Sequence, residues 1–430
     1  MILKLKNLKH FLIACFAYWR YGRPARKLIV VGVTGTKGKS TTCRLVASVL
    51  EAGGYKVGML STVEFQIAEK RWSNDKKMTM LGLGQIQKML RDMVHAGCQY
   101  VVVETSSEGI LQYRHFGLHY DIAVFTNLGS EHSERHGGFE NLKADKGKMF
   151  AGLDEPRKKL FGKIIEKIII ANTDDAQSAY FLNFKADQKW TFGLQKNNSN
   201  NNVFGQIIAS DENGMDFSVN GKSYHLNIIG EFNVYNALAA IAVGQSIGMK
   251  EDKIASGLNA VRQVAGRMEF IDAGQSFKLV VDYAHEPMSL RALFETLRKL
   301  VAPKNGRVIG IIGSDGGGRD VSKRAKMGSV TGELADIVII TDVNCFDEDP
   351  ATIAEMLAEG ARAVGKKDQE NLFVEIDRRR AIELACQMAG PNDVIAITAK
   401  GTEPCIVVAN GVRIPWDDRQ VAKEILKKLK

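Results

Sequence analysis

The sequence has few cysteines, and none of them is spaced like a metal-binding or disulfide-forming pair. The six cysteines of the 430-residue chain are Cys15, Cys43, Cys98, Cys345, Cys386 and Cys405. Zinc ribbons and disulfide frameworks need cysteines at short, paired spacings, so this pattern argues against both and favours a reducing compartment. We therefore expect a cytoplasmic protein.

The N-terminus lacks an apolar run that could cross a membrane. The apolar stretch from Phe11 to Trp19 is much shorter than the ~20 residues that a spanning helix needs. No small-residue cleavage site follows it, which argues against a signal peptide. Basic residues flank the stretch, and two interpretations of residues 1–27 stay open: a helix packed on the protein body, or a basic amphipathic helix on an anionic membrane surface.

The sequence also lacks a basic tract interleaved with aromatic residues. The net charge of +9 suits anionic ligands such as nucleotides, but the lysines and arginines are scattered. We therefore expect no nucleic-acid partner. The length and the ordinary apolar and charged fractions indicate two or three globular domains rather than a disordered or fibrous chain.

The strongest motif is a glycine-rich stretch that directly follows a predicted buried strand. The apolar segment 28–31 leads into Thr34-Gly-Thr-Lys-Gly-Lys-Ser40, and helix-forming residues follow. In a phosphate-binding loop, backbone N–H groups and a helix N-terminus surround phosphate oxygens, Lys39 supplies a cation and Ser40 can ligate Mg²⁺. Val33 stands where the strict consensus has glycine, so the loop is a variant. The glycine turn of a dinucleotide fold is the alternative, but it does not account for Lys39 and Ser40.

The pattern of strands and helices predicts two α/β domains. Predicted strands at 56–60, 100–103, 122–125 and 168–172 alternate with helices, which is typical of a mainly parallel sheet. Alternating segments between 203 and 228 predict an antiparallel excursion, and a second strand–helix series begins near 261. We expect a helical arm (1–27), a P-loop domain with a mainly parallel sheet (28–262) and a Rossmann-like C-terminal α/β domain (263–430).

Polar residues follow two of these strands. Glu104 directly follows the predicted strand at 100–103. A magnesium ligand is expected at this carboxyl end of a strand beside a phosphate loop. A helix cap or a surface carboxylate is the alternative for Glu104. Asn127 and His132 follow the strand at 122–125, and His132 taken alone would be read as an ordinary surface histidine.

Six ordered motifs resemble those of the Mur ligases, the ATP-dependent amide-forming enzymes of cell-wall peptide synthesis. The motifs are the phosphate loop, Glu104-Thr-Ser-Ser107 with Arg114, Phe125-Thr-Asn-Leu128 with Glu131-His132, Gly230-x-x-Asn233-x-x-Asn236, Gly266-Arg-Met-Glu269 and Asp282-Tyr-Ala-His285. Within the family, the sequence is most similar to the UDP-N-acetylmuramoyl-tripeptide synthetase (MurE) type. The resemblance runs from about Leu28 to the C-terminus.

The resemblance implies a role for each matched residue. ATP would be bound by Gly35, Thr36, Lys37, Gly38, Lys39, Ser40, Thr41, Asn127, Asn236, Arg267 and Asp282. Ser40, Glu104, His132 and Lys146 would be metal ligands, with two Mg²⁺ ions expected. Lys146 falls where the family has a lysine that reacts with CO₂ to form a carbamate. Taken alone, Lys146 would be assigned to a solvated helix face.

The implied reaction passes through an acyl phosphate. ATP transfers its γ-phosphoryl group to the carboxylate of a peptide acceptor, and an amino acid then attacks and expels phosphate. His285 would accept the proton of the attacking amine. The resemblance assigns Thr105, Ser106 and Arg114 to the acceptor, and Asn344, Phe346 and Glu403 to the amino acid.

The sequence departs from the family in two places. Only residues 1–27 precede the resemblance, where the family has a domain that binds the UDP of the acceptor. The sequence therefore leaves open whether the acceptor is UDP-linked, lipid-linked or of another kind. The missing domain and the basic, apolar arm lead to the hypothesis of a lipid-linked or otherwise non-UDP acceptor met at the membrane. Where diaminopimelate-adding enzymes have Asp-Asn-Pro-Arg, this chain has Val343-Asn-Cys-Phe346. Without that arginine we expect lysine or another diamino acid, its distal ammonium received by Asp347, Glu348 or Glu403.

Three other functions are compatible with parts of the sequence. A pseudomurein peptide ligase would use the same core on another acceptor, and a folylpolyglutamate-synthase-like ligase would share the acyl phosphate. The alternative from another class is a regulatory P-loop nucleotide-binding protein without ligase activity. That alternative leaves Asp282 and His285 unexplained.

Overall fold

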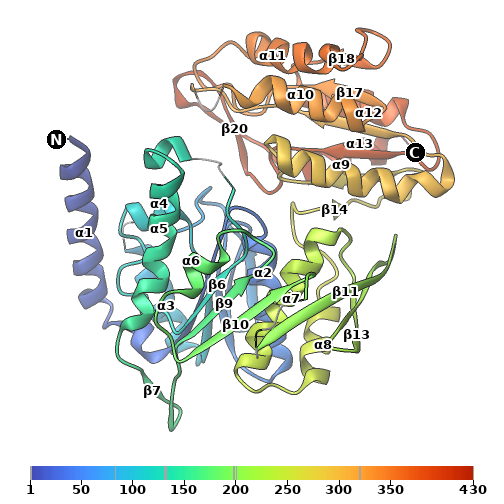
Figure 1. Ribbon diagram of the computed structural model, residues 1–430. Helices are drawn as coiled ribbons and strands as arrows, with labels where there is room; N and C mark the ends of the chain where they lie inside the picture. The colour runs from blue at the N-terminus through green and yellow to red at the C-terminus, as the bar shows by residue number, and fades with distance from the viewer. Residues whose placement is uncertain are drawn as a thin grey trace. The chain divides into compact units, whose positions relative to one another are not determined.

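The computed structural model describes residues 2–82, 84–129, 133–196, 199, 201–318 and 321–429. The chain divides into two compact units, residues 1–262 and 263–430. Each unit has a sheet of its own covered by helices (Figure 1). The α/β class expected from the sequence is confirmed.

Eleven strands form the sheet of the first unit in the part of the chain that the structure describes. Across the sheet they are β13 (Lys222–Leu226), β12 (Gly214–Val219), β11 (Asn202–Asp211), β10 (Gln188–Gly193), β9 (Ile168–Asn172), β6 (Ile122–Phe125), β1 (Ile29–Thr34), β5 (Tyr100–Glu104), β2 (Val57–Leu60), β3 (Glu64–Ile67) and β4 (Lys70–Ser73). A separate short hairpin pairs β7 (Lys159–Leu160) with β8 (Lys163–Ile164).

The middle of this sheet is parallel and its two ends are antiparallel. Parallel pairing runs from β11 through β10, β9, β6, β1 and β5 to β2. β12 and β13 extend it antiparallel at one end, and β3 and β4 at the other. The mainly parallel sheet with an antiparallel excursion is therefore confirmed. Strands β1, β5, β6 and β9 are buried along their whole length, as expected for parallel strands covered on both faces.

Helices cover both faces of this sheet. The helices of the first unit are α1 (Ile2–Arg20), η1 (Pro24–Lys27), α2 (Lys39–Ala52), α3 (Gln85–His95), α4 (Ser107–Leu111), η2 (Ser133–His136), α5 (Phe139–Ala151), η3 (Gly152–Asp154), α6 (Ser178–Leu182), α7 (Glu231–Ser246) and α8 (Glu251–Asn259). Side chains of α3, α5 and α6 join one apolar core with β1, β5, β6 and β9. α2 packs against α7, α8 and β5, and α7 packs against β9 and β10.

The helix α1 packs against the body of the first unit. The Phe11 ring lies 5.2 Å from that of Tyr113 and 5.3 Å from that of Phe116. The hydroxyl of Tyr18, a buried residue, lies 2.8 Å from His119 Nε2 and accepts a hydrogen bond from Arg26 at 3.0 Å. No helix within the described residues is long and apolar enough to cross a membrane.

The second unit has a six-stranded sheet within the residues that the structure describes. Across the sheet lie β14 (Glu269–Phe270), β15 (Lys278–Val281), β19 (Val394–Ile397), β16 (Val308–Ile312), β17 (Ile337–Ile340) and β18 (Leu372–Val374). Only the β14–β15 pair of this sheet is antiparallel among the described strands. The remaining elements are α9 (Pro287–Val301), η4 (Ala302–Lys304), α10 (Lys323–Leu334), α11 (Pro350–Ala363), α12 (Arg378–Met388), β20 (Cys405–Val407), η5 (Ala409–Gly411), β21 (Arg413–Pro415) and α13 (Asp418–Lys428).

Candidate active site

The phosphate loop connects β1 to α2 at the carboxyl edge of the parallel strands. Gly38 precedes α2 with a φ of 80°, a left-handed conformation that favours glycine. A Cβ atom at Gly38 would also collide with the side chain of Asn236. The sequence therefore places a glycine where both the backbone and the neighbouring helix α7 require one.

The two residues that follow β6, Thr126 and Asn127, stabilise this loop through hydrogen bonds. The Lys37 amide donates to Asn127 Oδ1 at 2.8 Å, and the Thr36 amide donates to the Asn127 carbonyl at 2.8 Å. Thr126 Oγ1 donates to the Lys37 carbonyl at 2.7 Å. Asn127 therefore supports the loop through its backbone and its side chain. Sequence reasoning had assigned no role to Thr126.

Two lysine ammonium groups lie at the loop. Lys39 Nζ donates to the carbonyls of Gly35 and Thr36, at 3.0 and 2.9 Å. Lys146, which is buried in α5, donates from Nζ to the same Gly35 carbonyl at 3.0 Å. The solvated helix face considered for Lys146 alone is therefore wrong, because the side chain turns inward to the loop.

A buried carboxylate lies at the start of α2. Glu104 Oε2 accepts hydrogen bonds from Ser40 Oγ at 2.9 Å and from the Thr62 amide at 2.7 Å. Thr62 Oγ1 donates to Glu104 Oε1 at 2.8 Å. The structure brings Ser40 and Glu104 together, and the surface carboxylate considered for Glu104 is wrong because the residue is 2% exposed. Thr62 was missed, although it follows β2 at the same edge of the sheet.

The Ser40 and Glu104 oxygens fit a magnesium ion. Hydroxyl and carboxylate oxygens are ligands that Mg²⁺ accepts, and the ion commonly completes its shell with water and substrate phosphates. Among the described residues, no group of three or more His, Cys, Asp or Glu side chains could hold a metal. His132, the third expected ligand, lies outside the described residues.

A buried hydrogen bond that sequence reasoning missed joins His136, at the end of η2, to Asp145 of α5. His136 Nδ1 lies 2.7 Å from Asp145 Oδ2, and both side chains are buried. Lys148 Nζ donates to Asp145 Oδ1 at 2.6 Å. Asp145 therefore fixes the turn of α5 that carries Lys146. The nine-residue separation of the pair offered no local sequence signal.

Asn236 and Thr41 lie where α7 meets the start of α2. Asn236 Oδ1 accepts from Thr42 Oγ1 at 3.1 Å, and its Nδ2 donates to Asn233 Oδ1 at 3.0 Å. Thr41 is 6% exposed. The structure thus places Asn236 beside the phosphate loop.

The residues expected to bind the acceptor lie after β5. Ser106 Oγ caps α4 by accepting from the Gly109 amide at 3.1 Å. Thr105 is fully buried, with its hydroxyl 2.9 Å from that of Tyr120. Arg114 donates to the Met80 carbonyl at 2.6 Å, and burial lowers the pKa of its guanidinium. Arg114 lines a pocket, whereas the Thr105 side chain faces the core.

In the second unit, three expected residues cluster near Tyr283. The Arg267 guanidinium lies 4.7 Å from the centre of the Tyr283 ring. Asp282 accepts from the amides of Met268 and Ala284, both at 2.7 Å. His285 Nδ1 donates to the Tyr283 carbonyl at 2.7 Å, which leaves the ring lone pair of neutral His285 on Nε2.

A second cluster in this unit surrounds Lys400, which is fully buried. Its ammonium donates to Asn344 Oδ1 at 3.2 Å and to Glu403 Oε2 at 3.1 Å. Asn344 Nδ2 donates to Glu403 at 3.2 Å and to Asp315 Oδ1 at 2.8 Å. The Phe346 amide donates to the Val407 carbonyl at 3.1 Å. The structure therefore brings Asn344 and Glu403 together around Lys400.

Sequence comparison relates the chain to one family. A family model described as Mur ligase middle domain matches residues 33–244, and one described as Mur ligase, glutamate ligase domain, matches residues 266–401. The chain is 37% identical to UDP-N-acetylmuramyl-tripeptide synthetase of Roseiflexus sp. (strain RS-1) over 417 residues, which cover 95% of this chain and 80% of the relative. It is 36% identical to UDP-N-acetylmuramoyl-L-alanyl-D-glutamate--2,6-diaminopimelate ligase of Geobacillus kaustophilus (strain HTA426) over 419 residues, with 95% and 80% covered.

Solved structures share the fold. The structure of a UDP-N-acetylmuramoyl-L-alanyl-D-glutamate--2,6-diaminopimelate ligase matches with a TM-score of 0.62 and 27% identity, covering 94% of this chain and 79% of that one. Mycobacterium tuberculosis folylpolyglutamate synthase complexed with ADP matches with a TM-score of 0.65 at 17% identity, covering 90% and 91%. At that identity the second match concerns the fold alone. With both domain models and relatives above one-third identity over most of its length, the chain belongs to the Mur ligase family.

Proposed function

We propose that this chain is an ATP-dependent ligase that joins an amino acid to a carboxylate of a cell-wall peptide precursor and releases ADP and phosphate. The observation that carries the proposal is the convergence of Lys39, Lys146 and the Ser40–Glu104 pair on one phosphate loop. A cationic Lys39 and a buried carboxylate at a helix N-terminus suit a triphosphate with its magnesium ion.

The proposed reaction activates a carboxylate that is otherwise a poor electrophile. A carboxylate oxygen of the acceptor attacks the γ-phosphorus of ATP, ADP leaves, and an acyl phosphate forms. The nitrogen of the amino acid then attacks the acyl carbon and phosphate leaves. Lys39 and the loop amides hold the triphosphate, and Mg²⁺, held by Ser40 and Glu104, supplies further charge neutralisation.

A proton must leave the amine during the second step. We assign this proton to Nε2 of His285, because Nδ1 already donates to the Tyr283 carbonyl. His285→Gln should lower the rate of amide formation while leaving the affinity for ATP unchanged. An unchanged rate would remove His285 from the mechanism.

Phosphate release tests the proposed function directly. A ligase releases phosphate from ATP only when both UDP-N-acetylmuramoyl-L-alanyl-D-glutamate and a suitable amino acid are present. A regulatory P-loop protein would instead hydrolyse or bind nucleotide regardless of the amine. Folate and pseudomurein peptides, offered as acceptors in the same assay, distinguish the other ligase classes.

Lys146 is proposed to carry a carbamate that helps hold a second Mg²⁺. In this step the neutral amine attacks CO₂, one proton leaves, and an anionic oxygen ligand replaces a cation. Lys146 is buried, and its Nζ lies at the phosphate loop, 3.0 Å from the Gly35 carbonyl, where a carbamate would face the bound triphosphate. NMR with carbon-labelled bicarbonate should give a carbamate signal that Lys146→Arg loses, and an unlabelled wild-type protein would overturn the proposal.

We propose lysine or another diamino acid as the amine donor. Glu348 is ion-paired with Arg324 at 2.9 Å, and Asp347 accepts from the Asn410 amide at 2.8 Å. Glu403 is therefore the residue proposed to bind the distal ammonium of the amino acid. That ammonium would compete with Lys400, whose Nζ lies 3.1 Å from Glu403 Oε2. An amino-acid screen scored by phosphate release tests this, and a strong preference for diaminopimelate would contradict it.

The outer face of α1 supports a proposed contact with an anionic membrane. Leu12, Phe16 and Trp19 are 58%, 71% and 64% exposed and lie at helical spacing on one side of α1. The Arg23 guanidinium lies 4.4 Å from the Trp19 ring centre, and Arg20 is also exposed. Apolar and aromatic side chains beside arginines are typical of helices that lie on anionic lipid surfaces.

Vesicle flotation tests the membrane contact. The protein should float with vesicles that contain phosphatidylglycerol and not with phosphatidylcholine alone. Replacing Leu12, Phe16 and Trp19 by serine should abolish flotation, whereas Ile414→Ser, at an exposed site of the second unit, should not. A wild-type protein that ignores anionic vesicles would contradict the proposal.

A further inference from the structure

A short hairpin projects from the first unit near the end of α1. Its two strands are β7 and β8, and Figure 1 shows it leaving the body of the unit on the side where α1 ends. Phe161 and Ile164 of this hairpin are 56% and 64% exposed. The hairpin therefore presents two large apolar side chains to solvent within one short segment.

Phe161 stands at the tip of the hairpin in a backbone conformation that does not suit it. The turn between β7 and β8 consists of Phe161 and Gly162, with φ values of 52° and 77°. Two-residue turns with a positive φ at both positions favour asparagine or aspartate followed by glycine, because a bulky side chain is strained there. Folding alone would thus favour asparagine at position 161, and a strained, exposed phenylalanine indicates a role in binding.

A buried carboxylate fixes the base of the hairpin to the body. Asp121 is fully buried and accepts from Lys158 Nζ at 2.6 Å and from Lys167 Nζ at 3.0 Å. These two lysines lie on either side of the hairpin in the sequence, and Lys158 also donates to the Leu28 carbonyl at 2.9 Å. A two-stranded hairpin alone is marginally stable in water, so these hydrogen bonds hold its tip in place.

The base of the hairpin also lies next to the end of α1. Leu28, which accepts from Lys158, directly follows η1. His119 connects α1 to the segment before the hairpin, because its Nε2 lies 2.8 Å from the Tyr18 hydroxyl and its Nδ1 is hydrogen-bonded to Glu155. The hairpin and the end of α1 are therefore parts of one rigid edge of the first unit.

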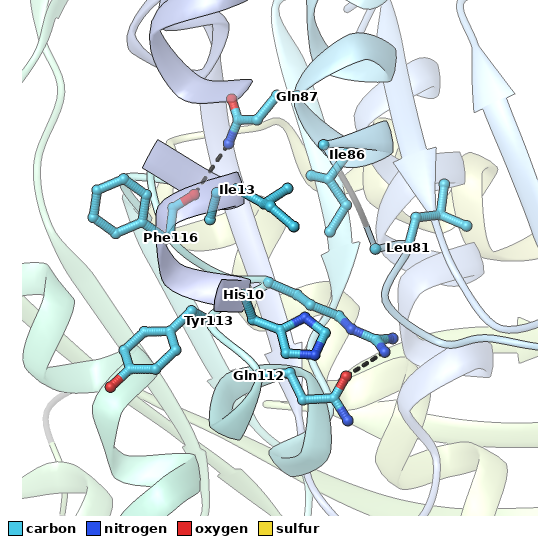
Figure 2. A pocket seen from close by; sticks show the side chains of 12 residues that line it. His10, Ile13, Leu81, Ile86, Gln87, Gln112, Tyr113 and Phe116 are labelled. Carbon is cyan, nitrogen blue, oxygen red and sulfur yellow. Dashed lines mark hydrogen bonds between the residues drawn. The ribbon is translucent and has the colours of Figure 1, made fainter. Parts of the chain in front are cut away.

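α1 turns one side to the body and the other to solvent. His10 and Ile13 line the pocket between α1 and the body, as Figure 2 shows. Leu12, Phe16 and Trp19 are exposed on the other side. Among the described residues of the first unit, the exposed large apolar side chains outside α1 and the hairpin are Tyr113, Ile208 and Phe232. Most of them are thus concentrated in these two elements, which is typical of an interaction surface.

Cations surround these apolar side chains. Lys159 and Lys163 are exposed in the hairpin, and further exposed cations lie between the end of α1 and β1, namely Arg20, Arg23, Arg26 and Lys27. The acidic residues near the hairpin have partners of their own: Asp154 with Lys185, Glu155 with His119, Glu166 with Gln188 and Asp187 with Arg157. Apolar tips beside cations are complementary to an anionic lipid surface.

We propose that the β7–β8 hairpin is a second lipid anchor, which inserts Phe161 and Ile164 into the headgroup region of an anionic membrane. Lys159 and Lys163 contact the anionic headgroups beside them. The inference rests on the proposed membrane contact of α1 and adds a second point to it. Two contacts on one rigid edge bind a surface more tightly than either contact alone, because the second forms at a high effective concentration.

Phe161→Asn tests this anchor, because it separates lipid binding from folding. Asparagine suits the turn, so the melting temperature should stay the same or rise. The partition coefficient into vesicles that contain phosphatidylglycerol should fall by about tenfold, since a large apolar side chain no longer leaves water. Val412→Asn, at an exposed site between β20 and β21 of the second unit, is the matched control and should bind as the wild-type protein does. An unchanged partition coefficient of Phe161→Asn would overturn the inference.

The cations of the hairpin are tested by salt. The double variant Lys159→Gln and Lys163→Gln should bind the same vesicles about tenfold more weakly at low ionic strength. The difference from the wild-type protein should shrink as salt screens the headgroups. Equal binding of both proteins at low ionic strength would contradict the contact of these lysines with lipid.

Comparison of the variants distinguishes failure of the hairpin anchor from failure of the other proposals. If the variant of Leu12, Phe16 and Trp19 loses binding and Phe161→Asn does not, the contact of α1 stands and the hairpin anchor is wrong. A wild-type protein that ignores anionic vesicles would overturn both contacts, whereas phosphate release without vesicles tests the ligase function separately. Self-association that Phe161→Asn abolishes at unchanged vesicle binding would assign the hairpin to a second copy of the chain and overturn the inference.

Discussion

Glu104 is the residue on which the charge of the phosphate site depends most directly. Glu104→Gln keeps the size of the side chain but removes the negative charge beside Ser40. We expect a loss of about 100-fold or more in kcat/KM for ATP, because charge at the magnesium site is lost. Circular dichroism and the melting temperature should change little. Glu140→Gln on the exposed face of α5 is the control, and equal losses in both variants would contradict the role of Glu104.

His115 makes the stability of the first unit depend on pH. Burial, reinforced by the charge of Lys148, lowers the pKa of His115 from 6.5 to about 4. Between these values the unfolded chain binds a proton that the folded chain does not, so stability falls as the pH falls from 6.5 towards 4. The full effect of this histidine is about 3 kcal/mol.

His115→Asn removes the titrating group and should flatten that decline. Guanidinium unfolding at several pH values in this range, for both proteins, measures the difference. The carboxylates contribute equally to the pH dependence of the unfolding free energy in the wild-type protein and in the variant. Parallel curves for wild type and variant would show that His115 does not carry the effect.

The position of the glycine-rich loop between β1 and α2 was predictable because its residues are contiguous in the sequence. The roles of Thr62 and Thr126 were not, since each depends on a strand edge that only the folded sheet creates. Lys146 shows the same limit. The neighbouring residues Lys143 and Lys148 favoured the interpretation of a solvent-exposed helix face. The packing of α5, which directs the Lys146 amine to the Gly35 carbonyl, could not be read from the sequence.

Gly117 controls how closely α1 approaches the body. Gly117 has a φ of 74°, and an added Cβ would collide with the Tyr18 ring. We expect Gly117→Ala to cost about 1–3 kcal/mol, through backbone strain and displacement of α1. Trypsin should then cleave at Lys9 and Arg20 faster than in the wild-type protein, while cleavage in the second unit keeps its rate. Equal cleavage rates in α1 would show that the helix is not held by this contact.

Strands in the middle of the sheets were predictable because both their faces are buried. β6 and β9 have the predicted ends, since each is a continuous apolar run bounded by polar residues. The edge hairpin β3–β4 was missed, because β4 is largely exposed and its Lys-Arg-Trp-Ser sequence has no apolar alternation. Polar edge strands form because a neighbouring strand offers hydrogen bonds, which a local pattern does not reveal.

We expect the activity of the whole protein to depend on a divalent cation, because the Glu104 carboxylate and the phosphates of ATP would bring negative charges together at one site. Removing Mg²⁺ with EDTA should abolish phosphate release, and added Mg²⁺ should restore it. Ca²⁺, which takes more ligands at longer distances, should restore far less. Full activity in EDTA, measured by product formation, would contradict the proposed charge neutralisation by Ser40, Glu104 and the ion they hold.

Transfer of heavy oxygen is the most direct test that ATP activates the acceptor as an acyl phosphate. The reacting carboxylate of the acceptor is labelled with heavy oxygen, and the phosphate released during amide synthesis is analysed by mass spectrometry. The proposed reaction predicts one labelled oxygen in each phosphate, because the attacking carboxylate oxygen leaves with the phosphoryl group. Unlabelled phosphate would contradict the account, since ATP would then be cleaved without phosphorylating the acceptor.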